Sequence, residues 1–432
     1  MINKQKIEDL LTIIKNITSK YVIQNSNAFF DEPPFFFYSG LIKNSKKNYY
    51  RSLGYQIFNG NIVGGGSSYN NKELAILKCE AELIERFCMF CFLEKDILFK
   101  NSASISVDKF LHPKFYKNEV RDSNMGWVKA TELILEKPWY IPAQLIYLNY
   151  YKWAKKNKIG EYEFVQHISN GGSFGFLKEE TILRGIYELI ERDSVLTVYL
   201  SKIKTPRIDI SSIDNPAIKK FHDLAKQYNF EIILLESTND LEVPTYISIA
   251  LDKSGLPPNI TVGVDADINE EDAILGSLEE SFMGRTWVRH ELMIRNNQLP
   301  KIQPNKIRTR LERAFYFSDK KNVQKLDYLI DQLPKPFKRR KKIKFKSEKE
   351  ELSNLLTFLK KKNMRVFAID IKPLFLQKYP FCVYKIIMPE LQYLYLDETT
   401  NKIINWDRIA QVNEFFSCKK PEKINTVPHF LL

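Results

Sequence analysis

The chain has 432 residues, enough for one large domain or for two or three ordinary ones. Hydrophobic residues make up 44% of it, which supports a substantial core and argues against intrinsic disorder. The net charge of +13 favours anionic partners such as phosphate, an acidic peptide or nucleic acid.

The N-terminal part has a helical pattern and no export signal. Periodicity predicts a helix over Lys6–Lys20, and a Pro- and Phe-rich connection follows at Asp31–Phe37. The first residues contain neither an apolar core nor a small-residue cleavage site, and no later apolar run reaches the about 18 residues that a membrane span requires. We therefore expect a cytoplasmic protein without a membrane segment.

Two glycine- and serine-rich segments interrupt the chain, and each precedes a predicted helix. Gly64–Ser68 is followed by a helix over Asn71–Leu93, and Ser169–Gly175 by one over Lys178–Leu200. A third helix is predicted over Glu270–Arg295. The strand-like segments are Trp127–Tyr150, which Pro138 and Pro142 interrupt, Glu231–Glu236, Thr245–Leu251, Ile260–Asp265, Val366–Ile371 and Cys382–Met388. Because the strands come in runs, we expect an α/β chain of the α+β type with mixed or antiparallel sheets.

Two other patterns leave alternatives open. Cys88 and Cys91 have the spacing of a zinc or redox motif, but no second pair accompanies them, so core cysteines on a helix are favoured. The basic segment Lys335–Lys346 is interpreted as an exposed connection, and a docking surface for an acidic partner is the alternative.

The pentapeptide Glu-Leu-Ile-Glu-Arg occurs twice, at Glu82–Arg86 and at Glu188–Arg192. Residues three and four apart share a helix face, so each copy presents two carboxylates and one guanidinium together. A single copy is typical of a solvated helix face with an internal ion pair. Two copies, each after a glycine-rich segment, favour a duplicated site with pseudo-symmetric halves.

The third helix adds Glu280 and Arg285 to this set. Several carboxylates beside an apolar stripe need partners, because burying an unpaired charge costs several kcal/mol. Mg²⁺ takes carboxylate and phosphate oxygens, and arginines bind phosphate in bidentate fashion. The glycine-rich segments would supply backbone N–H groups to phosphates. No Walker A motif and no GxGxxG before a helix is present, so the sequence predicts a nucleotide site of another kind.

At these residues the chain resembles the YcaO-domain family of ATP-utilising enzymes. The matching segments are Gly64–Arg86, Ser169–Asp193, Ala273–Arg285, Trp127–Ala143 and Val383–Pro389. The resemblance implies a YcaO-like fold at residues 51–432, with residues 1–50 as an N-terminal extension.

The resemblance also implies ATP and Mg²⁺ as cofactors and assigns roles to residues at matching positions. The expected metal-binding carboxylates are Glu82, Glu85, Glu191 and Glu280, and the expected nucleotide-binding residues are Ser173, Glu188, Arg192 and Arg285. The C-terminal carboxylate of Leu432 is the candidate catalytic base. The chain departs from the family pattern in two places: its tail keeps Pro428-His429 without the later prolines, and Met283 stands where the family often has Gln.

The family chemistry implies a cyclodehydratase subunit that phosphorylates a peptide amide oxygen and converts Cys, Ser or Thr of a ribosomal precursor peptide into azolines, as in bacteriocin-like products. The alternatives are a thioamide- or amidine-forming YcaO enzyme and a non-catalytic scaffold. No fused ThiF-like domain is expected, so a separate ThiF-like leader-binding protein would present the peptide, or a TfuA-like protein in the thioamide alternative. A flavin dehydrogenase and a homodimer are further possible partners. No nucleic acid or membrane partner is expected.

Overall fold

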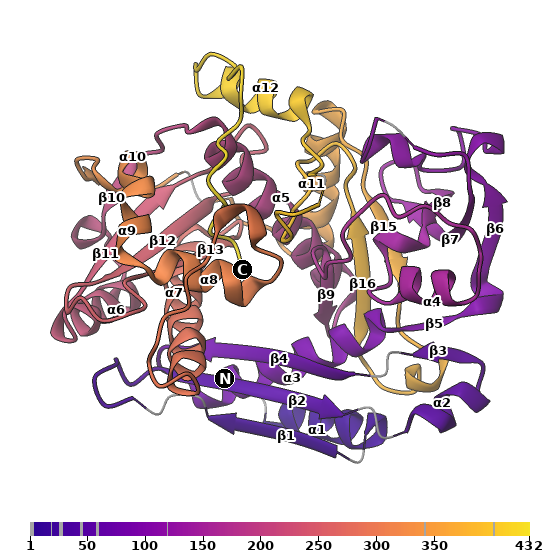
Figure 1. The fold of residues 1–432 in the computed structure, drawn as a ribbon, viewed down its shortest axis with the longest axis horizontal. Coiled ribbons are helices and arrows are strands. Elements are labelled where there is room, and N and C mark those ends of the chain that lie inside the picture. Colours follow the sequence, from indigo (N-terminus) through magenta and orange to yellow (C-terminus); the bar gives the residue numbers. More distant parts are fainter. Residues whose placement is uncertain are drawn as a thin grey trace.

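The computed structural model describes residues 4–18, 20–25, 29–43, 46–57, 60–118, 120–340, 343–400 and 402–432. Within them, strands form three larger sheets and one two-stranded ribbon. Figure 1 shows the N-terminal sheet at the bottom, a second sheet on the left and a third on the right, with helix α5 between the last two. The mixed helices and largely antiparallel sheets confirm the predicted α+β class.

The strands pair antiparallel except β10 with β14, which are parallel. The N-terminal sheet has the order β1 (Lys20–Asn25), β2 (Phe36–Lys43) and β4 (Asn61–Ser68). The second has the order β13 (Ile260–Ala266), β12 (Thr245–Asp252), β11 (Phe230–Glu236), β10 (Arg207–Asp209) and β14 (Lys335–Pro336). The third has the order β6 (Ile97–Asn101), β7 (Asn124–Glu132), β15 (Phe367–Asp370), β16 (Cys382–Ile387) and β9 (Gly172–Gly175), with β8 (Lys137–Pro142) paired to β7. The ribbon joins β3 (Tyr55–Ile57) to β5 (Cys91–Leu93).

Three long helices lie where the apolar periodicity predicts them, with ends shifted by a few residues. They are α3 (Lys72–Met89), α5 (Lys178–Ser201) and α7 (Glu270–Met293). The other helices are α1 (Lys4–Ile17), α2 (Lys47–Ser52), α4 (Tyr150–Lys156), α6 (Pro216–Gln227), α8 (Arg310–Ser318), α9 (Lys320–Val323), α10 (Asp327–Ile330), α11 (Glu348–Lys361) and α12 (Trp406–Phe415). The predicted strand region Trp127–Tyr150 splits into β7, β8 and the start of α4.

The first glycine-rich segment is a strand rather than a break in the chain. Gly64–Ser68 forms the second half of β4, which packs directly on α3. A Cβ atom at Gly66 would lie 2.1 Å from the backbone oxygen of Ala75 in α3, closer than any side chain allows. The glycines are therefore needed because strand and helix backbones touch here. In the second segment Gly171 occupies a turn with φ of +80°, and β9 follows immediately.

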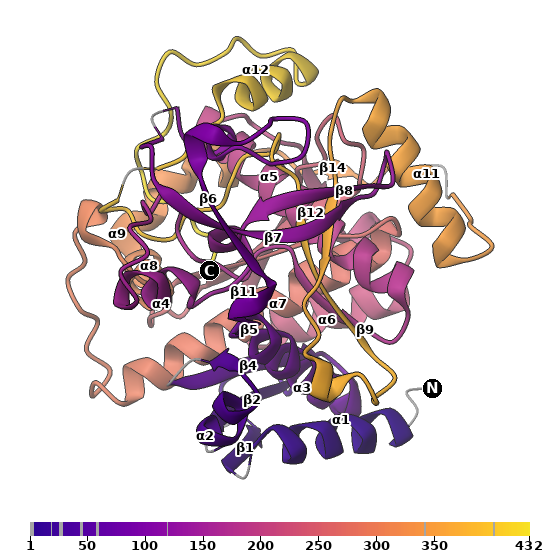
Figure 2. The ribbon, with the colours of Figure 1, turned by 90° about the vertical axis from the view of Figure 1, so that its right-hand side faces the viewer.

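The N-terminal region shares its core with the first long helix. Leu10, Ile13 and Ile14 of α1 are buried in the same hydrophobic cluster as Leu83 and Ile84 of α3. Figure 2 shows α1 lying along the base of the molecule below α3. The domain boundary at residue 50 stays a prediction, but residues before it support the helix that carries the first pentapeptide.

The structure shows the surroundings of the cysteine pair and of part of the basic segment, for which the sequence leaves alternatives open. Cys88 and Cys91 are 0% and 2% exposed and unbonded, as core cysteines are. In the basic segment, Arg339 forms an ion pair with Glu271 and Arg340 with Glu236, whereas residues 341–342 lie outside the described part. None of the helices described has the length and hydropathy needed to cross a lipid bilayer.

Candidate active site

The three long helices each follow a strand and place a glutamate against that strand's backbone. The carboxylate accepts a hydrogen bond from a main-chain N–H near the preceding turn or strand. The pairs are Gly65 with Glu82, Gly171 with Glu188 at 3.0 Å, and Val264 with Glu280 at 2.6 Å. In the first two units the donor lies 17 residues before its acceptor. Two of the glycine amides in the segments predicted to bind phosphate, those of Gly65 and Gly171, are thus already bonded to the helix that follows.

Partly buried carboxylates of α3 and α5 lie close enough to influence one another's pKa. Burial, together with the charges of Glu188 and Glu82, raises the pKa of Glu85 to about 8. Burial likewise raises the pKa of Glu188, while Arg192 and Lys385 oppose this shift. The carboxylates of α3 and α5 therefore belong to one electrostatic cluster, as the repeated pentapeptide indicates.

A second group of carboxylates joins α5 to α7. Burial raises the pKa of Glu191 well above its usual range, and Glu280 and Asp265 add to the shift while Arg192 opposes it. Burial, then Asp267 and Glu280, raises the pKa of Asp265. Asp265 was not among the predicted site residues, although its position at the end of a predicted strand just before the third helix was a usable signal.

The carboxylates are near enough to shift one another's pKa, but they do not converge on one point as metal ligands do. Within the described residues no three His, Cys, Asp or Glu side chains converge as metal ligands would. The donor set nevertheless fits Mg²⁺, which usually takes one or two carboxylates and completes its shell with water and substrate phosphate oxygens. The metal-binding roles of Glu82, Glu85, Glu191 and Glu280 stay predictions. In such a site the phosphate oxygens of the nucleotide would complete the coordination shell of the metal.

Arg192 is the cation at the centre of this cluster. Its Nε lies 2.9 Å from Oε1 of Glu191, and its Nη2 lies 3.8 Å from Glu280. The first contact is misaligned, so Nε and Nη1 of Arg192 and Oε1 of Glu191 are buried without a hydrogen-bond partner in the described part of the chain. Burial opposes its charged form, but Glu191, Glu280 and Glu188 raise the pKa of Arg192. A charged guanidinium with unused donors is suited to an anionic ligand.

Arg310, at the start of α8, is a second guanidinium that the sequence interpretation missed. Within the described residues it makes no hydrogen bond or ion pair, yet it interacts electrostatically with Arg86, Glu82 and Arg192. Desolvation and the neighbouring positive charge of Arg86 lower the pKa of Arg310. No motif marks this residue, because its segment is brought to the cluster only by the tertiary fold.

Strand β9 and the turn before it carry two further polar side chains, Ser173 in the strand and Asn170 in the turn. Ser173 is 3% exposed, and its hydroxyl donates to the carbonyl of Tyr384 at 3.4 Å. Asn170 is buried, and its Oδ1 has no hydrogen-bond partner among the described residues. Lys385 of β16 lies against the same turn. The lysine was visible in the sequence as one charge in an otherwise apolar strand, but it was not assigned a role.

Arg285 is not brought to the cluster. Five residues separate it from Glu280, so the two side chains lie about 140° apart around α7. Its guanidinium donates to Glu32 at 2.7 Å and to Asp252 at 2.6 Å, and a further donor binds the carbonyl of Pro258. The structure therefore gives Arg285 a buried ion-pair network, and its predicted contact with nucleotide stays untested.

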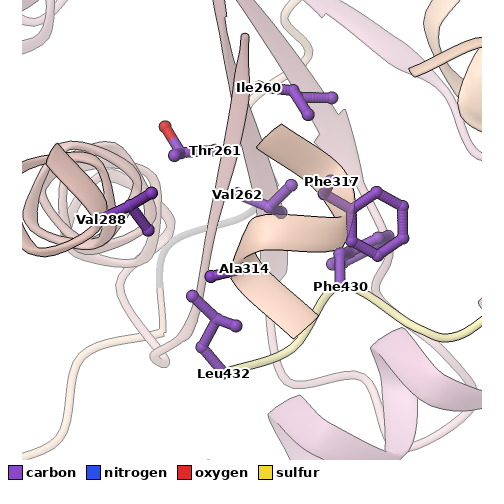
Figure 3. Close-up of a pocket in the computed structure, with 8 residues that line it drawn as sticks. All are labelled: Ile260, Thr261, Val262, Val288, Ala314, Phe317, Phe430 and Leu432. Carbon is purple, nitrogen blue, oxygen red and sulfur yellow. The ribbon is translucent and has the colours of Figure 1, made fainter. Parts of the chain in front are cut away.

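The C-terminal tail is anchored between α5, α7 and α8. Tyr199 donates to the carbonyl of Pro428 at 2.9 Å, and Arg313 donates to that of His429 at 2.6 Å. The side chain of Leu432 lines an apolar cavity of about 20 Å³ with Val288 of α7 and Ala314 of α8 (Figure 3). No ion pair holds the C-terminal carboxylate within the described residues, and its catalytic role stays a prediction.

Comparison with known proteins places this geometry among similar folds. A family model described as YcaO cyclodehydratase, ATP- and Mg²⁺-binding, matches residues 69–392. The solved structure "Heterocyclase in complex with substrate and Cofactor" has a TM-score of 0.72 at 16% identity, over 98% of this chain and 57% of that one. YcaO from Methanopyrus kandleri bound with AMPPCP and Mg²⁺ has a TM-score of 0.66 at 15% identity, over 98% and 96%. The E. coli microcin synthetase McbBCD complex gives 0.61 at 15%, over 91% and 95%. At these identities the likeness shows the fold.

Two curated relatives match over shorter stretches. An uncharacterised protein of Methanothermobacter thermautotrophicus is 25% identical over 169 residues, which is 39% of this chain and 43% of that protein. A Rhizobium leguminosarum bv. trifolii protein, described as an uncharacterised protein in the tfuA 3' region, is 29% identical over 101 residues, or 23% of each. The matched stretch thus spans less than half the length of either relative.

Proposed function

The chain belongs to the YcaO family, and from this premise we propose that it is the ATP-using subunit of a cyclodehydratase that forms azolines in a ribosomally made precursor peptide. Family membership confirms the predicted YcaO-type enzyme and its ATP and Mg²⁺ cofactors. The peptide substrate, the azoline product and the partners are the proposal.

The observation that carries the proposal is the partly buried acid cluster, with Glu191 at its most buried position, around an Arg192 that has unused hydrogen-bond donors. Carboxylates from α3, α5 and α7 raise one another's pKa, and the guanidinium among them has two donors without a hydrogen-bond partner. Such an arrangement is costly in a protein that binds nothing there, because buried unpaired polar groups destabilise the fold. A magnesium-bound triphosphate would satisfy both the carboxylates and the guanidinium.

In this proposal the residues divide by chemistry. Glu82, Glu85, Glu191 and Glu280 are the candidate Mg²⁺ carboxylates, and Ser173, Glu188 and Arg192 are candidate nucleotide contacts. Bound ATP would supply the phosphoryl group that converts an amide oxygen into a leaving group. The chain's own residues would hold the phosphates in position and neutralise their charge, which is most of what phosphoryl transfer requires of a protein.

The order of bond changes follows from the product. A Cys, Ser or Thr side chain of the peptide would lose its proton and attack the preceding amide carbon. The former carbonyl oxygen would take the phosphoryl group of ATP, leaving ADP, and would depart as phosphate while the amide nitrogen loses its proton and the C=N bond forms. The net change in the peptide is the loss of one water for each ring. A separate ThiF-like leader-binding protein would present the peptide, and a flavin dehydrogenase would be needed only to oxidise azolines to azoles.

A second candidate, thioamide formation, is favoured by one comparison. The Rhizobium relative is described by its location in the tfuA 3' region, and a TfuA-like partner is what we expect of a thioamide-forming system. In that case external sulfide replaces the attacking side chain, and oxygen is exchanged for sulfur without ring formation.

Mass spectrometry separates these candidates. The full chain, its genomically neighbouring precursor peptide and the neighbouring partner protein are co-expressed, and the peptide is weighed. Loss of one water per modified residue is expected, whereas exchange of oxygen for sulfur would establish thioamidation instead. Glu191→Ala or Glu82→Ala should abolish the mass change; unchanged modification by either variant would contradict the site assignment.

A non-catalytic scaffold is the alternative of another class. It predicts that the wild-type chain does not bind Mg-ATP, which isothermal titration calorimetry measures directly. Binding that requires Mg²⁺ would exclude the scaffold as an explanation for the buried carboxylates.

A further inference from the structure

Lys385 is a buried lysine beside the proposed nucleotide site. It lies on β16, where its backbone pairs with Gly172 of β9, and its side chain is 1% exposed. Lysine is almost never fully buried unless it is paired. A lysine in this position therefore needs partners and a reason to be there.

The three N–H donors of Lys385 are used on three consecutive main-chain carbonyls. Nζ lies 3.1 Å from the oxygens of Ile168 and Ser169 and 2.6 Å from that of Asn170. An ammonium group has only three hydrogens, so no donor is left over for a ligand. Lys385 is thus a fixed part of the turn and does not itself contact the nucleotide.

Hydrogen bonds also fix the position of Gly171 in this turn. The amide of Gly171 donates to Glu188 at 3.0 Å, and the carbonyl of Gly171 accepts from Ile386 at 2.7 Å. The carbonyls of residues 168–171 and the amide of Gly171 are therefore bonded within the protein. The side chain of Asn170 is available to a ligand, because its Oδ1 is buried without a partner in the described part of the chain.

Lys385 also connects the two pentapeptide helices electrostatically. It interacts with Glu188 of α5 and with Glu85 of α3, and it is the cation that both glutamates share. The positive charge of Lys385 offsets part of the repulsion between these two carboxylates. The same ammonium therefore fixes the turn and the relative charge balance of the two halves.

From these contacts we propose, resting on the proposed ATP-dependent function, that Lys385 is a positioning residue for the nucleotide site. It holds the Ser169-Asn170-Gly171 turn so that Asn170 and Glu188 are pre-oriented before Mg-ATP arrives. This role gives the buried, fully hydrogen-bonded ammonium a function at the site.

Lys372 provides a matched control within the same chain. Its ammonium also holds main-chain carbonyls, those of Tyr379 at 2.6 Å and Phe381 at 2.8 Å, but none of the candidate site carboxylates interacts with it. Lys385→Met and Lys372→Met therefore remove the same kind of contact, at the site and away from it.

The experiment measures Mg-ATP affinity by calorimetry and amide hydrogen exchange of the peptide that covers residues 168–173. Lys385→Met should weaken Mg-ATP binding about tenfold or more and speed exchange in that peptide before nucleotide is added. Lys372→Met should leave both unchanged, even if it lowers the melting temperature as much. Equal affinity of Lys385→Met and wild type, or unchanged exchange at 168–173, would overturn the proposal.

Chemical rescue adds a readout that a general loss of stability would not produce. Propylammonium should restore Mg-ATP affinity to Lys385→Ala, whereas the neutral propanol should not; rescue by both or by neither would count against a positioned ammonium. If the wild-type chain fails to bind Mg-ATP, the proposed function is wrong, and the exchange measurement still decides whether Lys385 orders the turn.

Discussion

The two copies of Glu-Leu-Ile-Glu-Arg have the same sequence but different surroundings. In the first, Arg86 forms an ion pair with its own Glu82 and donates to the carbonyl of Val63. In the second, Arg192 approaches Glu191 and Glu280 and keeps two buried nitrogen atoms without a hydrogen-bond partner. The two identical helix segments thus differ in their arginines: Arg86 has partners for its guanidinium, whereas Arg192 has donors without a hydrogen-bond partner.

The first glutamate of each copy shows what the duplication preserves. Glu82 and Glu188 both accept a hydrogen bond from a glycine amide 17 residues earlier, so the strand-to-helix unit is the same in both halves. The surroundings of the two arginines differ in the charged residue that another helix contributes. Helix α7 places the carboxylate of Glu280 near Arg192, whereas α8 contributes the guanidinium of Arg310, which interacts with Arg86. We infer that the second arginine is the one held ready for an anion.

The largest expected effect concerns the third helix and is an effect on stability. Arg285→Met removes a buried cation and leaves Asp252 without its ion pair, while Glu32 keeps the one with Arg289, so the free energy of unfolding should fall by about 3 kcal/mol. Urea unfolding of the full chain measures this. Mg-ATP affinity of the folded fraction should be unchanged. Weaker affinity with normal stability would instead support the nucleotide role predicted from the sequence.

Arg192→Gln should produce the largest loss of nucleotide binding. It removes a charged donor group from the centre of the acid cluster, and hydrogen bonds to charged groups are worth about 1.5–3 kcal/mol, or roughly tenfold to hundredfold in affinity. Calorimetric titration with Mg-ATP is the measurement. Arg184→Gln on the same helix is the control, because Arg184 is exposed and, among the described residues, forms its ion pair with Glu180 alone. Equal affinities of the two variants would remove the proposed difference between the copies.

The sequence could predict the helices and the carboxylates but not which arginine is free. Periodicity places α3, α5 and α7 within a few residues, because the apolar stripe follows from local spacing. By contrast, the glycine-rich sequence of β4 predicts a break in the chain, and the segment is a strand. Its glycines allow close contact with α3, which depends on the tertiary fold. Arg285 was grouped with Glu280 by proximity in sequence, although the helix turns it toward Glu32.

The residues that were missed share one property: their partners are far away in sequence. Arg310 meets Arg86 and Arg192, and Lys385 meets carbonyls more than 200 residues earlier. Neither belongs to a motif with regular spacing. Asp265 is a partial exception, since a carboxylate at the end of a strand leading into the third helix could have been included.

Arg310→Gln should weaken Mg-ATP binding by less, about fivefold, on the order of 1 kcal/mol. Arg310 is exposed by surface area, although nearby protein atoms partly desolvate its guanidinium, so water and salt would partly screen its contact with a phosphate, and the loss should shrink as ionic strength rises. Arg308→Gln, two residues earlier in the same exposed segment, is the control. Comparison with AMP sharpens the result: a phosphate-tail contact predicts a loss for ATP and little for AMP, and equal losses would contradict it.

Arg86→Gln should have the smallest effect on nucleotide binding, and it tests the comparison most directly. Its pair with Glu82 lies four residues apart on one helix, and the two side chains are 16% and 31% exposed. Such pairs contribute about 0.3–0.5 kcal/mol, so the free energy of unfolding should change little and Mg-ATP affinity by less than about threefold. A double-mutant cycle with Glu82→Gln isolates the pair from the bond between Arg86 and the Val63 carbonyl. If Arg86→Gln weakened Mg-ATP binding as much as Arg192→Gln, both arginines would contact the nucleotide. The duplicated helices would then be functionally equivalent halves despite their different contacts.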